Sequence, residues 1–138
     1  ITSTDLPANA AYLIGIEMNI LNVHVNRSPI GGKVILCRCT KGKFMSLRKP
    51  ESEAANERVT TVIGNGAFEI GIVQISSRLV RKIVSYIQEG DSLAIGQRLG
   101  AIVFGSQVDV VMPALLGLRI EVKAGDEVKA GISVMARY

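Results

Sequence analysis

The sequence predicts a mainly β chain (β-rich α+β) with one or two short helices. Val and Ile are abundant, aromatic residues make up only 4% of the chain, and 14 glycines punctuate it. β-Branched residues between closely spaced turn residues are typical of many short strands. With 138 residues, 48% of them apolar, the chain is long enough for one domain with its own core, which we place at residues 1–138.

Strand patterns cover 11–16, 33–40, 58–64 and 67–75, after a polar segment at 1–10 that we expect to be a loop or an edge. The last two flank Asn65-Gly66, a strong hairpin signal. Residues 76–87 are ambiguous, because their apolar positions fit one helical face whereas their β-branched residues favour a strand. We expect a short helix or a strand lead-in there.

The last third of the chain contains a repeat. GDSLAIG at 90–96 matches GDEVKAG at 125–131, 35 residues later, and a short strand is expected after each, at 99–104 and 132–136. Two such units resemble the compact barrel-sandwich hybrid of biotinyl and lipoyl carrier domains. No lysine stands in the Met-Lys setting that those carriers modify, so a carrier function is not supported.

The composition limits the partners. A net charge of +4 suits an anionic membrane surface or an anionic substrate, and the scarcity of stacking aromatic residues argues against nucleic acid. Cys37 and Cys39 point to one face of a strand, and with His24 as the only histidine they cannot complete a zinc site. We expect no metal, and we expect both cysteines to be small buried residues.

No apolar run approaches the ~18 residues of a membrane-spanning helix. No signal peptide is visible. The chain starts at Ile1 rather than Met, so a trimmed chain or an absent upstream segment is expected.

Residues 103–110 form one extended pattern that Gly105-Ser106 interrupts. Val108 and Val110 share one face, and Gln107 and Asp109 share the other. Taken alone, the Gly-Ser pair predicts a strand with a bulge. It also places a hydroxyl beside a carbonyl that no side chain shields, which suits attack by the hydroxyl on its own preceding peptide bond.

Four segments, in this order, resemble the phosphatidylserine decarboxylase family in its short bacterial and archaeal form. The first is NVHVNRSP at 22–29, similar to the family's Asp-Val-His-Val-Asn-Arg-Ser/Ala-Pro. The second joins GKF at 42–44 to NER at 56–58, and the third joins VQI at 73–75 to RKIV at 81–84. The fourth is GQRLGAIVFGS at 96–106 with VDV at 108–110.

The resemblance implies a pyruvoyl enzyme. In it, Ser106 attacks the Gly105 carbonyl, the chain is cut between them, and Ser106 becomes a covalent pyruvoyl cofactor. The products are a β chain, 1–105, and an α chain, 106–138. The cofactor's ketone then takes up the electrons released by decarboxylation. His24 is the proton donor expected for that reaction and a candidate base for the cleavage, because histidine exchanges protons near neutral pH.

The implied substrate is phosphatidylserine or archaetidylserine, which is converted to the ethanolamine-headed lipid. Arg27, Arg81 and Lys82 are candidate ligands of its phosphate, because cationic donors suit that anion. We expect peripheral membrane association on the cytoplasmic side, a heterodimer of the enzyme's own α and β chains, and a higher homo-oligomer.

Two departures from the family pattern stand out. Asn22 occupies the usual Asp position, and no Ser-Pro-x-Asp-Gly segment, whose Asp pairs with the histidine, precedes His24. Asp5 does not match it. Either an upstream segment is absent from this sequence or self-cleavage is impaired. Two alternatives therefore stand beside the lipid decarboxylase, namely a non-catalytic barrel-sandwich module for binding or scaffolding, and a pyruvoyl decarboxylase of a soluble amino acid.

Overall fold

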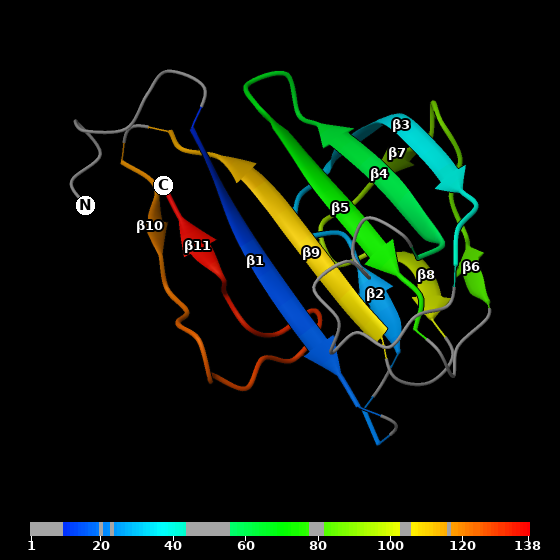
Figure 1. Cartoon of the computed structure of the whole chain (residues 1–138). Coiled ribbons are helices and arrows are strands. Elements are labelled where there is room, and N and C mark those ends of the chain that lie inside the picture. The colour runs from blue at the N-terminus through cyan, green and yellow to red at the C-terminus, as the bar shows by residue number, and fades with distance from the viewer. Residues whose placement is uncertain are drawn as a thin grey trace.

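The computed structural model describes residues 10–19, 21–22, 24–43, 56–77, 82–102, 106–115 and 117–138 (Figure 1). The described residues form short antiparallel strands and no helix, which confirms the mainly β prediction. The strands are β1 (Ala11–Met18), β2 (Val25–Arg27), β3 (Gly32–Thr40), β4 (Arg58–Gly64), β5 (Glu69–Ile75), β6 (Ile83–Ser85), β7 (Ser92–Leu93), β8 (Arg98–Ile102), β9 (Ser106–Pro113), β10 (Arg119–Ile120) and β11 (Ala136–Arg137).

The largest sheet has six strands in the order β1-β9-β5-β4-β3-β7 (Figure 1). β9, from late in the sequence, lies between β1 and β5 and pairs with both. A second sheet has the order β2-β8-β6, and β10 and β11 form a separate pair. Core residues from both larger sheets, such as Ile72, Val110 and Ile102, pack into one buried cluster.

The Asn65-Gly66 turn connects β4 to β5 as predicted. Asn65 accepts hydrogen bonds on its Oδ1 from the amides of Ala67 and Phe68, at 2.9 and 3.0 Å, and Gly66 adopts a positive φ of 91°. The strand predicted at 33–40 is β3, and its register against β4 shifts between Val34 and Leu36.

The 35-residue repeat is a structural repeat. Asp91 Oδ2 accepts the Gln88 amide at 2.9 Å, and Asp126 Oδ2 accepts the Lys123 amide at 3.0 Å. The two glycines of each unit also match, with φ of 92° and 94° at the first position and 78° and 76° at the second. The strand after the second unit is shorter and later than predicted, because β11 begins only at Ala136.

The chain changes sheet between Ile102 and Ser106, and Gly105, where the bulge was predicted, lies outside the described residues. β8 ends at Ile102 in the three-stranded sheet, and β9 begins at Ser106 in the six-stranded sheet. The predicted alternation along β9 is correct for its two faces, although Gln107 and Asp109 are buried as well as Val108 and Val110.

Two other predictions need qualification. Of the residues in the ambiguous 76–87 segment, 78–81 lie outside the described part of the chain, and Ile83–Ser85 form strand β6 rather than a helix. Both cysteines are free thiols. Cys37 is half-buried, whereas Cys39, one residue before the end of β3, is exposed. The prediction of two buried cysteines is therefore wrong for Cys39.

Candidate active site

Two buried polar atoms in the described part of the chain lack a hydrogen-bond partner, and both belong to predicted site residues. They are His24 Nε2 and Ser106 Oγ. An unsatisfied buried polar group costs roughly 1–3 kcal/mol, so native structures rarely keep one without a reason. The sequence selected these two residues independently of their burial.

Ser106 is the first residue of β9, and only 1% of it is exposed. Side chains alternate along a strand, so Ser106 shares the core face with Val108 and Val110. Its partner in the β1–β9 register is Met18, the last residue of β1. The hydroxyl therefore points into the space between the two sheets, immediately after the chain has crossed from one to the other.

His24 follows a tight turn between β1 and β2. Asn22 Oδ1 accepts the Asn19 amide at 2.8 Å, and Asn19 Oδ1 accepts the Leu21 amide at 2.9 Å. Asn22 acts here as a hydrogen-bond acceptor, a role that an aspartate at this position could also fill. The His24 carbonyl then accepts the Ile102 amide at 3.1 Å, which places His24 beside the end of β8.

The end of β8 gathers predicted site residues from both sides. His24 lies on the β2 side, and Ile83 pairs with Ile102 on the β6 side, which places the exposed Lys82 next to the same end. Ser106 follows Ile102 by four positions along the chain. The fold therefore brings His24 and Lys82 to one end of the three-stranded sheet, and Ser106 begins β9 of the six-stranded sheet four positions later.

Arg27 lies at the opposite end of β2. It is aligned with Arg98, and its Nη1 donates to the Gly96 carbonyl at 2.8 Å. Its Cδ also lies against Gly131, where an added Cβ would come within 2.9 Å. Arg27 thus joins the second glycines of the two repeat units, which is a structural role. The other predicted residues, Gly105 and Arg81, lie outside the described residues.

Two polar residues that the sequence did not single out lie beside this site. Gln74 and Asn26 are 2% and 8% exposed, and Gln74 Nε2 donates to Asn26 Oδ1 at 2.7 Å. Asn26 Nδ2 in turn approaches Met18 Sδ at 3.8 Å. Asn26 belongs to the NVHVNRSP run, and Gln74 is a lone polar residue at an inward position of an apolar strand. Those two signals could have identified them.

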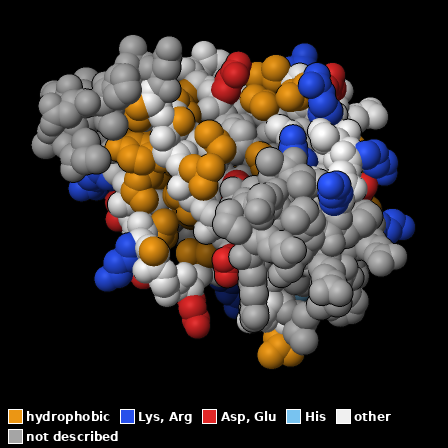
Figure 2. All heavy atoms as spheres, in the orientation of Figure 1, with side chains coloured by type: hydrophobic (Ala, Val, Ile, Leu, Met, Phe, Trp, Pro, Cys, Tyr) orange, Lys and Arg blue, Asp and Glu red, His pale blue; other side chains and the backbone are white. Residues whose placement is uncertain are grey.

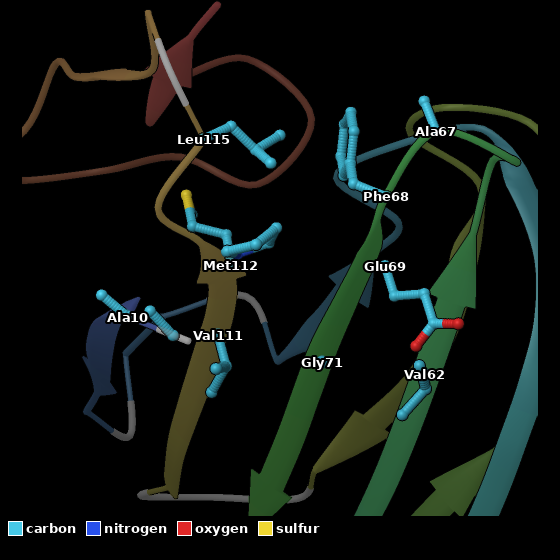
Figure 3. Close-up of a pocket in the computed structure, with 11 residues that line it drawn as sticks. Ala10, Val62, Ala67, Phe68, Glu69, Gly71, Val111, Met112 and Leu115 are labelled. Carbon is cyan, nitrogen blue, oxygen red and sulfur yellow. The ribbon is translucent and has the colours of Figure 1, made fainter. Parts of the chain in front are cut away.

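A separate groove of about 620 Å³ opens on the outer face of the six-stranded sheet (Figure 3). Val111, Met112 and Leu115 lie on one side and Phe68 and Glu69 on the other, across the bare backbone of Gly71. It contains neither His24 nor Ser106 and lies near the far end of β9. Hydrophobic side chains gather on this face in Figure 2.

The family model described as phosphatidylserine decarboxylase matches residues 3–136. The chain belongs to the phosphatidylserine decarboxylase family. The phosphatidylserine decarboxylase proenzyme of Chlorobium chlorochromatii is 43% identical over 93% of this chain and 59% of its own length. A relative from Methanocaldococcus jannaschii, provisionally named an archaetidylserine decarboxylase proenzyme, is 39% identical over 93% of this chain and 61% of its own length.

A third relative in the family, the phosphatidylserine decarboxylase proenzyme of Geobacter sp., is 42% identical over 88% of this chain and 55% of its own length. The chain thus spans about three fifths of the length of these curated relatives. No solved structure matches it at a comparable level of similarity. The resemblance that the four sequence segments predicted is confirmed at the level of the family.

Proposed function

We propose that this chain is the precursor of a pyruvoyl-dependent decarboxylase that cuts its own backbone between Gly105 and Ser106. In the first step Ser106 Oγ attacks the Gly105 carbonyl carbon. The carbon–nitrogen bond to Ser106 breaks, an ester forms on Oγ, and the displaced nitrogen becomes an amine. This step is supported by the buried Ser106 hydroxyl, which makes no hydrogen bond that would compete with the attack.

The second step is an elimination at Ser106. A base removes the Cα proton, the Cβ–Oγ bond breaks, and Gly105 leaves as a carboxylate. The dehydroalanine that remains takes up water and releases ammonia, which leaves a ketone at position 106. His24 is the proposed acid and base, because its Nε2 is buried without a partner and its carbonyl accepts the Ile102 amide at the end of β8.

The two fragments would remain associated after the cut. β9 lies in the fragment 106–138, yet it pairs with β1 and β5 of the fragment 1–105 along most of its length. Separating them would remove Val108, Val110 and Met112 from the core. This topology supports the proposed heterodimer of α and β chains. A higher homo-oligomer remains part of the proposal.

Ser106 fits the formation of a pyruvoyl group. The ketone of that group would accept the electrons left when CO2 departs. The proposed substrate is a serine-headed phospholipid, phosphatidylserine or archaetidylserine, as the names of the relatives suggest. Lys82 is the better placed of the two described cations to bind its phosphate, because it lies at the same end of the sheet as His24. His24 would then deliver the proton to the product carbon.

A lipid substrate calls for contact with a membrane, and we propose peripheral association on the cytoplasmic side. The net charge of +4 would favour an anionic surface. Within the described ranges there is no helix with the length and hydropathy needed to cross a bilayer.

The observation that carries the proposal is the pair of buried, unpartnered atoms of His24 and Ser106 at the point where the chain changes sheet. Mass spectrometry of the purified protein tests it. We expect two fragments, with 106–138 lighter by one ammonia than simple hydrolysis would leave it. An intact chain, or a fragment that retains serine at position 106, would refute the cleavage chemistry.

A Ser106→Ala variant is the control and should stay intact. Assays with phosphatidylserine vesicles and with free serine then separate the substrates. Turnover of free serine alone would point to a decarboxylase of a soluble amino acid. A wild-type chain that stays uncut but binds phosphatidylserine vesicles would favour the non-catalytic binding module.

A further inference from the structure

Gln74 and Asn26 form a polar bridge between the two larger sheets. Gln74 lies on β5 of the six-stranded sheet, Asn26 lies on β2 of the three-stranded sheet, and 2.7 Å separates Gln74 Nε2 from Asn26 Oδ1. Both side chains are more than nine-tenths buried. A hydrogen bond between two buried carboxamides has few competing partners, so it fixes the two strands relative to each other.

The bridge passes directly over Gly100. Gly100 is the register partner of Asn26 on β8, and a Cβ added there would lie 3.3 Å from Gln74 Nε2 and 2.4 Å from the Val84 carbonyl oxygen. The glycine therefore leaves the space through which the Gln74 carboxamide reaches β2. The surrounding residues are arranged to admit this contact.

The bridge also joins the two candidate catalytic residues through short connections. Asn26 is the central residue of β2, two positions after His24, whose carbonyl accepts the Ile102 amide at 3.1 Å. On the other side of the gap, Asn26 Nδ2 contacts Met18 Sδ at 3.8 Å, and Met18 is the register partner of Ser106. Gln74 is itself the register partner of Val108, two residues from Ser106.

We infer that Gln74 and Asn26 are positioning residues that align His24 with the Gly105–Ser106 peptide bond during self-cleavage. The inference rests on the proposed function. Gln74 holds Asn26, Asn26 fixes β2 beside Met18, the register partner of Ser106, and His24 directly precedes β2. Neither side chain needs to exchange a proton, because the bridge acts on the geometry of other groups. Small displacements of reacting groups are costly, with a 1 Å error worth roughly 100-fold in rate.

The test compares self-cleavage in four purified precursors: wild type, Gln74→Met, Asn26→Leu and the double variant. Freshly made protein is followed over time by mass spectrometry, and hydroxylamine is added to trap the ester. Thr61→Val is the matched control, because Thr61 is also a buried polar residue (2% exposed) of the same sheet, but its hydroxyl donates to Cys37 Sγ rather than to Gln74 or Asn26.

We expect each single variant to cut about 10- to 100-fold more slowly than wild type and to trap less ester. The double variant should be no slower than the slower single variant, because both substitutions remove the same hydrogen bond. Thr61→Val should cut within about twofold of wild type. Thermal unfolding of each uncut chain shows whether a slow variant is folded under the assay conditions.

Several results would overturn the inference. Folded variants that cut at the wild-type rate would exclude a positioning role, and so would rate losses that multiply in the double variant. A loss in Thr61→Val as large as in Gln74→Met would show that lowered stability alone slows the cut. If the wild-type chain does not cut itself, the proposed function is refuted, and the positioning role of Gln74 and Asn26 is refuted with it.

Discussion

Ser106 lies opposite Met18 in the antiparallel register of β9 and β1, and the Met18 sulfur lies 3.8 Å from Asn26 Nδ2. Three strands from two sheets thus meet at the residue whose hydroxyl is proposed to cut the chain. Their meeting explains why a polar residue at the first position of a core strand is only 1% exposed.

Replacing Ser106 with Ala should leave the fold intact and make it slightly more stable. The Ser106 hydroxyl is buried without a partner, so its removal should raise the free energy of unfolding by about 1 kcal/mol. Urea unfolding of Ser106→Ala can be compared with wild-type chain isolated before it is cut. A clear loss of stability would show that the hydroxyl has a structural partner.

Replacing His24 with Ala should slow self-cleavage by about 10²- to 10⁴-fold, which is the usual contribution of a general acid or base. The side chain makes no hydrogen bond through Nε2, so the variant should still fold. Cleavage is followed by mass spectrometry, and folding is checked by near-ultraviolet circular dichroism or by thermal unfolding. Undiminished cleavage in the variant would remove His24 from the cutting step.

Gly100→Ala should be destabilising, whereas Gly71→Ala on the neighbouring face should be tolerated. A Cβ at Gly100 would lie 2.4 Å from the Val84 carbonyl oxygen, a backbone atom that cannot move away alone. At Gly71 the nearest atom is Val111 Cβ, 3.6 Å away. We expect a loss of about 2 kcal/mol or more at Gly100 and a change within ~1 kcal/mol at Gly71 in urea unfolding. Equal effects would contradict the close packing of β8 on β6.

The two cations described near β2 and β6 should behave differently. Lys82→Ala should raise KM for the lipid substrate about 3- to 10-fold with little change in kcat, as expected for a lost phosphate contact. Arg27→Ala should leave KM unchanged but lower the free energy of unfolding by about 1 kcal/mol, because it removes the bond to the Gly96 carbonyl. Vesicle assays and urea unfolding of both variants measure this contrast, and a reversed pattern would assign the phosphate to Arg27.

The Asp turns of the two repeat units should each contribute to the free energy of unfolding. Asp91→Ala and Asp126→Ala each remove one acceptor from a backbone amide, so each should cost roughly 0.5–1.5 kcal/mol in urea unfolding. Asp91 is half-buried and Asp126 is exposed, so the Asp91 variant should lose more. If Asp126→Ala were the more damaging variant, the second turn would have to carry contacts beyond its own amide.

The sequence predicted the parts of this protein that depend on short-range patterns. Alternating apolar residues indicated β1, β3, β4 and β5, and Asn65-Gly66 indicated the hairpin of β4 and β5. Both signals are local, because strand period and turn chemistry act over a few residues. The repeat was visible because each unit closes its own Asp turn. His24 and Ser106 were identified through segments that resemble the family, and their side chains carry the buried unpartnered atoms Nε2 and Oγ.

Only the tertiary structure decided how distant strands pair. It placed β8 and β9, which flank the predicted cleavage site in the sequence, in different sheets, and it placed Arg27 and Lys82 at opposite ends of the β2-β8-β6 sheet. The 48 positions between Asn26 and Gln74 hide their hydrogen bond from any local pattern. Such contacts form only when two sheets pack and exclude water, so that buried polar groups must find each other across the core.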